Sequence, residues 1–247
     1  MKHVLNRRSV LALGASAMFA KPGFAAAERP VIVELFTSQG CSSCPAADAY
    51  LKSLKDRPGV VALSYHVDYW DYLGWRDTLG GAEYSQRQYD YAKSRGDSNV
   101  YTPQLVINGG KDYVASQRPV VSGAIDAAFA ENPGRSVDIA MSDNKTDVMI
   151  NIAAGDPIKE ATLWLMAFAP SVATEIKKGE NAGRTVEYYN VVRKMVPAGM
   201  WHGAPAKILL PKSSVIPEDC TGWVALLQEG KVGRIIGAAT GGVASNS

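Results

Sequence analysis

A pair of cysteines three positions apart, placed soon after an apolar run, constrains the fold of this chain more than any other feature. Residues 31–36 (VIVELF) are typical of a buried β-strand, and a short polar turn then leads into Cys41-Ser42-Ser43-Cys44-Pro45. Apolar side chains at helical spacing follow, so we expect a helix over residues 41–56 whose first turn holds both cysteines and tolerates the proline. Cβ atoms at this spacing lie ~5–6 Å apart, which lets the two sulfurs form a disulfide.

The place of the cysteines at a helix start also predicts their chemistry. Unpaired N–H groups and a partial positive charge there favour a thiolate, so we expect a lowered pKa for the leading thiol, Cys41. We therefore interpret the motif as a dithiol/disulfide centre. Two other interpretations stay open, a purely structural disulfide and half of a metal site. Structural zinc needs four ligands, and beyond residue 27 the chain adds only Cys220, His66 and His202 to the cysteine pair as sulfur or imidazole ligands.

The N-terminus has the composition of a targeting segment, and we assign residues 1–27 as a signal peptide. Three basic side chains precede an apolar run over residues 10–20, and three consecutive alanines supply a cleavage site. The stretch NRRSVL resembles a twin-arginine export signal, with an ordinary secretory signal as the alternative. The apolar run is too short to span a bilayer. We expect a mature chain that begins near Glu28 and is periplasmic or secreted.

Removal of this segment changes the charge balance. The whole chain carries 26 basic and 24 acidic side chains, and four of the basic ones lie in residues 1–27. The mature chain then has 22 basic against 24 acidic side chains, a formal net charge of −2, so no electrostatic case for nucleic-acid binding remains. No later apolar run approaches membrane length, so we expect no membrane insertion. Export favours an oxidised Cys41–Cys44 pair, because disulfides persist outside the cytosol.

Strand and helix patterns alternate from residue 28 to 133, which we predict to form one α/β domain. The order is β-α-β-α-β-β-α, which favours a parallel pair of strands with an added hairpin. With the two cysteines at the start of the first helix, this order resembles the thioredoxin fold. The expected strands are residues 31–36, 60–66, 105–108 and 113–115, and the expected helices are residues 41–56, 82–95 and 119–130.

The dipeptide Thr102-Pro103 stands where thioredoxin-like proteins place a cis-proline, just before the third core strand and opposite the cysteine pair. The resemblance implies a cis bond, which an X–Pro peptide reaches at a cost of only ~0.5–1 kcal/mol. It also implies that Thr102 and Pro103 bind the backbone of a partner chain and keep metals from competing. An ordinary trans proline that opens a strand is the alternative.

Longer segments narrow the resemblance to one family. They are VELFTSQGCSSCP at 33–45, HVDYWDYLGW at 66–75, VYTPQ at 100–104, GENAGR at 179–184 and NVVR at 190–193. These segments are similar to a family of exported bacterial proteins, known as domain of unknown function family 1223, that carries a thioredoxin-like domain. The resemblance covers nearly the whole mature chain. The family name carries no established reaction, so the resemblance bears on the fold more than on the function.

The loop after the second strand is a further candidate for the site, because ligands usually meet an α/β sheet at the carboxyl ends of its strands. Tyr69 and Trp70 offer flat apolar surfaces with polar edges, and we assign them, with Tyr101, to substrate binding. His66 is a candidate proton acceptor or metal ligand. The alternative is structural: the aromatic side chains fill a gap beneath the 82–95 helix, and His66 satisfies a buried backbone group.

Residues 134–240 have a different sequence pattern, and we predict that they form an all-β, sandwich-like domain. A flexible tail is expected at residues 241–247. Turn-rich breaks separate short strand patterns, and no segment has a convincing helical stripe. Cys220 is interpreted as a buried, inert thiol, with a resolving partner for Cys41 as the alternative. The expected strands are residues 137–141, 147–152, 163–168, 185–195, 207–210, 223–227 and 234–239.

The function that this sequence favours is exported thiol–disulfide exchange on a protein or small-thiol substrate, with no cofactor beyond the disulfide itself. Cys41 would attack or be attacked, and Cys44 would resolve the mixed disulfide. Two alternatives remain. A protein that binds or delivers copper or another soft metal would use Cys41, Cys44 and His66 as ligands. A non-catalytic binding protein would use the disulfide only to stiffen its fold.

Overall fold

The computed structural model describes residues 30–131, 137–157 and 160–242. The predicted signal peptide and most of the predicted tail lie outside these residues. Among the helices of the described ranges, none combines the length and apolar character needed to cross a membrane.

The first half of the chain has the predicted order of elements. β1 is buried along its whole length and runs parallel to β2 and antiparallel to β3. β4 pairs with β3 as the predicted hairpin. The elements are β1 (Val31–Thr37), α1 (Pro45–Lys55), β2 (Val60–His66), the 3-10 turn η1 (Asp71–Leu73), α2 (Ala82–Arg95), β3 (Gln104–Ile107), β4 (Asp112–Val114) and α3 (Arg118–Ala130).

The helix α1 begins at Pro45, so the prediction of a helical start at residue 41 was wrong. Cys44 is its N-cap residue, and the amide of Cys44 donates to the carbonyl of Cys41 at 3.2 Å, which closes a separate turn before the helix. Proline has no N–H to donate and fits the first helical position, where that N–H would have no helical partner. The two cysteines therefore lie just ahead of the helix rather than inside its first turn.

The second half is built mainly of strands, as predicted. Its longest elements are β7 and β8, which form an antiparallel hairpin. One short helical turn, α4, was not predicted. The elements are β5 (Ile139–Asp143), β6 (Asp147–Ile152), β7 (Ala161–Glu175), β8 (Thr185–Trp201), β9 (Ala206–Pro211), α4 (Lys212–Val215), β10 (Gly222–Glu229) and β11 (Ile235–Gly242).

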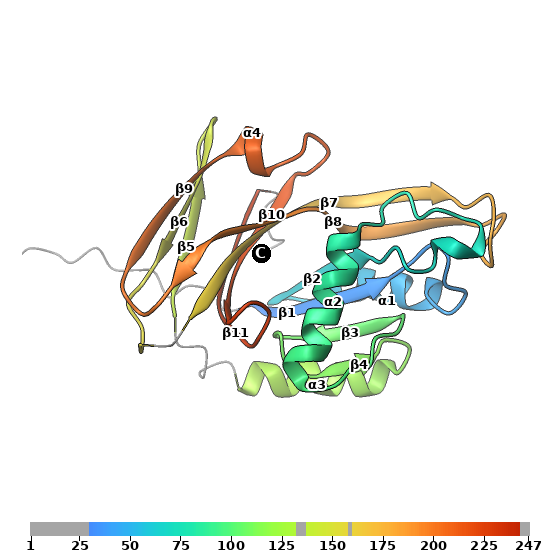
Figure 1. The fold of residues 1–247 in the computed structure, drawn as a ribbon, viewed down its shortest axis with the longest axis horizontal. Coiled ribbons are helices and arrows are strands. Elements are labelled where there is room, and N and C mark those ends of the chain that lie inside the picture. The colour runs from blue at the N-terminus through green and yellow to red at the C-terminus, as the bar shows by residue number, and fades with distance from the viewer. Residues whose placement is uncertain (1–29, 132–136, 158–159, 243–247) are drawn as a thin grey trace, which may run out of the picture.

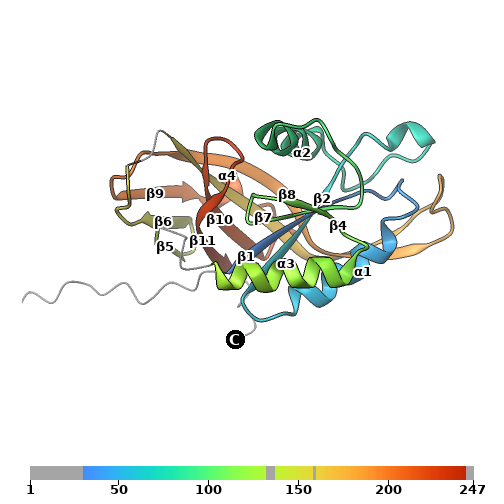
Figure 2. The ribbon, with the colours of Figure 1, turned by 90° about the horizontal axis from the view of Figure 1, so that it is seen from below.

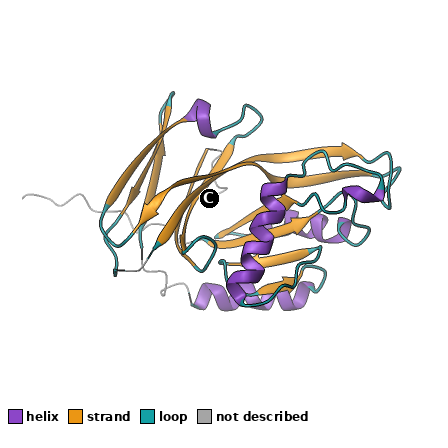
Figure 3. Ribbon diagram, in the orientation of Figure 1, coloured by secondary structure: helices purple, strands orange, loops and turns teal. Residues whose placement is uncertain are grey.

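Strands from both halves form one continuous sheet. Its eight strands lie in the order β11-β10-β7-β8-β2-β1-β3-β4, and a second sheet has the order β5-β6-β9 (Figure 1). The halves meet where β8 runs parallel to β2, with Ser64 paired to Val191, and the side-chain amide of Asn190 donates to the carbonyl of Ala62 at 2.8 Å. The molecule is thus a mixed α/β protein. Figure 3 shows the helices gathered at one end and, apart from α4, only strands at the other. The division into separate domains at residues 28–133 and 134–240 stays a prediction.

The large sheet is covered on both faces, which explains why β1 has no exposed residue. Its odd-numbered side chains from Val31 to Leu35 pack with α1 and α3, while Ile32 and Phe36 pack with Tyr84 and Tyr91 of α2 on the other face. Figure 2 shows α1 and α3 below the sheet and α2 above it. A third core joins β5 and β6 to inward side chains of β7, β10 and β11, so the second half contains two packed layers of strands.

Candidate functional site

Cys41 and Cys44 form a disulfide between the end of β1 and the start of α1, as the spacing predicted. Their Cα atoms are 5.4 Å apart, a normal separation for a disulfide. The sulfur of Cys41 is 3.3 Å from the hydroxyl of Ser43 and 3.7 Å from the backbone carbonyl of Thr102. Residues that are far apart in the sequence therefore meet at the disulfide.

The Thr102–Pro103 peptide bond is cis, as the resemblance implied. The structure places Trp70 beside it, since the indole N–H of Trp70 donates to the hydroxyl of Thr102 at 2.8 Å. Trp70 also approaches the cysteine turn so closely that a Cβ added at Gly40 would lie 3.0 Å from its Cβ. Of the three aromatic residues assigned to substrate binding, Trp70 is thus next to the disulfide.

The other two aromatic residues are anchored elsewhere. Tyr69 donates its hydroxyl to Gln88 of α2 at 3.1 Å and packs against the core beneath that helix. Tyr101 donates its hydroxyl to the carboxylate of Asp112 at 2.9 Å. The structural alternative therefore describes Tyr69 in part, because its hydroxyl also interacts with the side chain of Thr102. The direct approach to the cysteine turn is made by Trp70.

Both sulfurs are buried. Only 2% of Cys41 and none of Cys44 is exposed, although the attack predicted for Cys41 requires a partner to reach its sulfur. The turn between β7 and β8 is bonded to the cysteine turn, where the side-chain amide of Asn181 donates to the carbonyls of Gln39 at 2.9 Å and Cys41 at 2.8 Å. Sequence reasoning did not assign Asn181 a role, although its motif, GENAGR, was among the segments that carried the family resemblance.

A buried carboxyl group follows the cysteines at helical spacing. Asp48 lies one turn after Cys44, and its backbone N–H donates to the Cys44 carbonyl at 3.0 Å. One carboxyl oxygen accepts from the hydroxyl of Thr37 at 2.7 Å, and the other has no hydrogen-bond partner among the described residues. Burial raises the pKa of Asp48 from 3.8 to about 7, against the opposing effects of His66 and Thr37. Sequence reasoning missed this residue, because an acidic side chain in a first helical turn is common on solvated surfaces.

His66 is also fully buried, and its partner is a carboxylate instead of the backbone group that the structural alternative expected. Its Nδ1 lies 2.9 Å from Asp77, while its Nε2 has no hydrogen-bond partner among the described residues. Asp77 also accepts from the N–H of Gln39 at 2.8 Å and that of Leu79 at 2.9 Å, which ties this pair to the turn before Cys41. Burial acts to raise the pKa of Asp77, but His66 and the two N–H groups outweigh it and hold that pKa below its ordinary value.

No group of three or more histidine, cysteine, aspartate or glutamate side chains is arranged to hold a metal ion within the described ranges. The use of Cys41, Cys44 and His66 as ligands for copper or another soft metal stays a prediction. Cys220 lies in the second half, is buried, and has a pKa that burial raises to about 12. These properties fit the predicted inert thiol.

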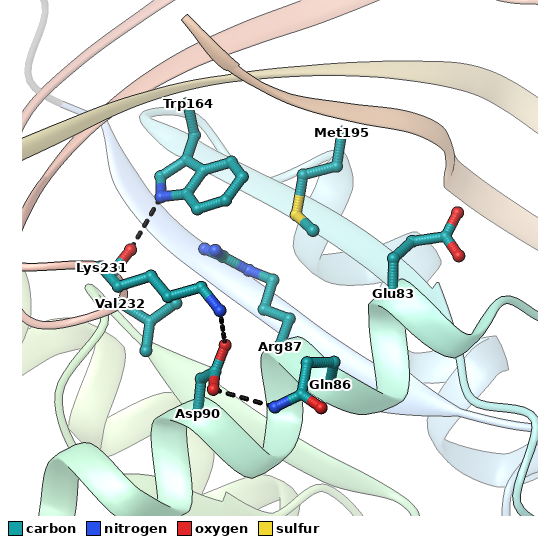
Figure 4. Close-up of a pocket in the computed structure, with 8 residues that line it drawn as sticks. All are labelled: Glu83, Gln86, Arg87, Asp90, Trp164, Met195, Lys231 and Val232. Atoms are coloured by element: carbon teal, nitrogen blue, oxygen red, sulfur yellow. Dashed lines mark hydrogen bonds and ion pairs between the residues drawn. The ribbon is translucent and has the colours of Figure 1, made fainter. Parts of the chain in front are cut away.

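A cavity of about 250 Å³ lies between α2 and the strands of the second half (Figure 4). The guanidinium of Arg87 points toward its middle, beneath the indole of Trp164 and beside Met195. None of the residues assigned from the sequence lines this cavity. Its interest is structural, because Arg87 donates to Glu34 of β1 and to Gln228 of β10, both at 2.8 Å, and so joins the two halves.

The fold and the site define a class: α/β proteins with a mixed eight-stranded sheet and a buried Cys-x-x-Cys disulfide at a helix start. The chain belongs to the family described as protein of unknown function DUF1223, whose profile matches residues 32–228. The family read from the sequence is thereby confirmed, while export and the thioredoxin-like character stay predictions.

The solved structures that are similar to this chain include the following two. The crystal structure of protein AGR_C_4864 from Agrobacterium tumefaciens is 34% identical, with a TM-score of 0.74 over 87% of this chain and 94% of that one. HBP35 of Porphyromonas gingivalis is 11% identical, with a TM-score of 0.55 over 88% of this chain and 76% of that one, a likeness of fold alone. No curated protein sequence matches the chain.

Proposed function

We propose that this protein is an exported, thioredoxin-like thiol–disulfide oxidoreductase that works through Cys41 and Cys44. The observation that carries the proposal is the disulfide itself, which lies against the backbone carbonyl of Thr102 at the cis peptide bond. Support also comes from Trp70, whose ring adjoins this peptide on the side of the cysteine turn. The N-terminal segment supports export, since it has the composition of a signal peptide.

The exchange would run in two steps. In the reduced protein, the Cys41 thiolate attacks one sulfur of a partner disulfide, and the other partner sulfur leaves as a thiolate. The Cys44 thiolate then attacks the Cys41 sulfur, re-forms the Cys41–Cys44 disulfide and releases the second partner sulfur. Two electrons pass from the protein to the partner, and the reverse sequence oxidises a partner dithiol.

Asp48 is suited to manage the proton of the second step. Cys44 must lose its proton before it can attack, and the carboxyl group one helical turn away has a pKa raised to about 7 by burial. A carboxylate with that pKa can accept a proton from a thiol near neutral pH and return it to water later. One carboxyl oxygen of Asp48 is available to accept this proton, because no described residue hydrogen-bonds to it.

A trapping experiment tests the proposal. Cys44→Ser leaves Cys41 to form mixed disulfides that cannot be resolved, so partners should accumulate as covalent adducts that dithiothreitol releases. Cys220→Ser is the matched control and should trap nothing, since it keeps both site cysteines. If Cys44→Ser yields no adducts from a periplasmic or secreted extract, and its Cys41 reacts with iodoacetamide no faster than a free thiol, the proposed exchange is wrong.

The burial of both sulfurs favours a second candidate, in which the disulfide only stiffens the cysteine turn. A structural disulfide of an exported protein typically has a reduction potential below about −300 mV, whereas exchange proteins have higher values. Titration of the Cys41–Cys44 pair in glutathione or dithiothreitol buffers therefore separates the two candidates.

A further inference from the structure

The turn at the tip of the β7–β8 hairpin is hydrogen-bonded to the segment that carries the disulfide. Residues 176–184 lie at the same end of the molecule as the turn between β1 and α1 (Figure 1). Asn181, which is 1% exposed, donates to the carbonyls of Gln39 and Cys41, and the carboxylate of Glu180 accepts from the N–H of Ser42 at 3.1 Å. These three hydrogen bonds join the tip to the backbone of the segment that carries the sulfurs.

The tip is a small, pre-formed unit that is held down at few points. Backbone hydrogen bonds from Ile176 to Arg184 and from Gly183 to Ile176 close it on itself, so it keeps its shape independently of the cysteine turn. Within residues 176–184 only Ile176 and Asn181 are buried, and the others are exposed. A contact made of polar bonds with so little apolar burial can open locally without unfolding of the sheet.

The groups under the tip have the character of a peptide-binding edge. Two carbonyl acceptors and one N–H donor belong to the backbone of residues 39–42, and the tip supplies two side chains that satisfy them. An extended polypeptide presents N–H and C=O groups along its own edge and could satisfy the same set. A small thiol has no such row of groups.

We propose that Asn181 and Glu180 hold the hairpin tip in the place where the extended backbone of a cysteine-containing partner protein binds, so that a partner must displace the tip to reach the disulfide. This inference rests on the proposed exchange function and names both the partner class and the control of access. It explains how a reactive disulfide is almost completely buried in the absence of a partner. It also predicts that the rate of exchange depends on residues 140 positions away in the sequence.

The test compares tip variants of the full-length mature protein in the oxidised state. The rate of Cys41–Cys44 reduction is measured with dithiothreitol and with a dithiol peptide of about ten residues. Asn181→Ala removes both bonds to the cysteine turn and should speed reduction by about tenfold or more. Asn181→Asp should act more strongly, because it sets carboxylate oxygens against two carbonyls. Glu180→Gln keeps an acceptor for the Ser42 N–H and should change the rate little, whereas Glu180→Ala should raise it.

Lys178→Ala is the matched control, since Lys178 is exposed on the same tip and should leave the rate unchanged. Melting curves of each oxidised variant show whether the fold is kept, and the Glu180 variants serve if Asn181→Ala does not fold. Equal reduction rates in the wild type, Asn181→Ala and Glu180→Ala would overturn the inference while exchange itself stands. If Cys44→Ser traps no partner and the tip variants are also inert toward the dithiol peptide, the proposed function itself fails. Acceleration by the tip variants, with Lys178→Ala unchanged, supports both.

Discussion

At the scale of single residues, the disulfide site is notable for ionisable side chains that are buried in the protein interior. Asp48, His66 and Asp77 are all at most 3% exposed, and only some of their polar atoms have hydrogen-bond partners among the described residues. Burial of a group that can ionise costs free energy unless a partner compensates it. Asp77 has such partners, whereas one oxygen of Asp48 has none. The ionised form of Asp48 is therefore the one whose burial is poorly compensated.

Asp48→Asn should stabilise the oxidised protein at neutral and alkaline pH. The raised pKa means that folded Asp48 holds a proton between pH 3.8 and about 7 that the unfolded chain has released. The free energy of unfolding of the wild type therefore falls as the pH rises through this window and is level above it. Asparagine cannot ionise and keeps an acceptor for Thr37, so the variant should gain roughly 2–4 kcal/mol at pH 8 and almost nothing at pH 4.

Urea unfolding at pH 4, 6 and 8 measures this difference. Asp126→Asn, at a largely exposed carboxylate that pairs with Arg57, should change stability by less than about 1 kcal/mol at each pH. A constant gap between wild type and Asp48→Asn across the three pH values would contradict a raised pKa at Asp48. His66, Asp77 and Tyr188 interact electrostatically with this carboxyl group.

At the scale of elements, local sequence patterns and tertiary packing contribute differently. The continuous apolar run of β1, together with the apolar face of α3, predicts which elements form, because each pattern is a property of neighbouring residues. The effect of packing between elements can be seen by comparing two glycines, one in a strand and one in a helix. A Cβ added at Gly222 of β10 would lie 2.3 Å from the ring of Phe168 on β7, whereas nothing lies within 4 Å of one added at Gly123 in α3.

The substitution of these two glycines by alanine should therefore have opposite effects. Gly123→Ala removes a flexible residue from an exposed position in the middle of a helix and should stabilise the protein by about 0.5–1 kcal/mol. Gly222→Ala forces a methyl group into the Phe168 ring and should destabilise it by about 1–3 kcal/mol. Thermal and urea unfolding of the two variants measure both effects. A neutral Gly222→Ala would mean that β7 and β10 can separate at this point without cost.

At the scale of the whole molecule, the two halves share a sheet and a buried hydrogen-bond network around the Arg87–Glu34 ion pair. Arg87 of α2 donates to Glu34 of β1 and to Gln228 of β10, while Tyr91 donates to the second oxygen of Glu34. The core above the sheet likewise mixes Tyr65 of β2 with Met166 of β7. Removal of one half would uncover this core and leave the hydrogen-bonding edge of β2 without β8.

We therefore expect that a truncated chain of residues 28–133 does not fold on its own, although the sequence predicted it to be a domain. Exposed apolar surface and an unpaired strand edge should make it aggregate or lack a cooperative transition. The full-length mature protein should unfold in one cooperative step. Circular dichroism and urea unfolding of both chains measure this. A cooperative, native-like transition of the fragment would instead support the predicted domain boundary.

The order of elements, the disulfide between Cys41 and Cys44 and the cis bond at Pro103 could all be anticipated from the sequence. Each depends on residues that lie close together in the chain or on a recognisable motif. The burial of the disulfide could not be anticipated. Neither could the bonds of Asn181 to the cysteine turn, since Asn181 looks like an ordinary turn residue until the β7–β8 hairpin is placed beside β2. Asp48 was missed for the same reason, since only packing of α1 on the sheet removes its carboxyl group from water.

The sequence by itself determined which segments become strands and helices and which two sulfurs can bond, because backbone preference and side-chain period act over a few residues. Tertiary structure decided that β8 joins β2 in one sheet and that the hairpin tip forms hydrogen bonds to the cysteine turn. Those outcomes depend on pairing between strands more than 100 residues apart, where many registers satisfy the local pattern and only the packing of the complete core selects one.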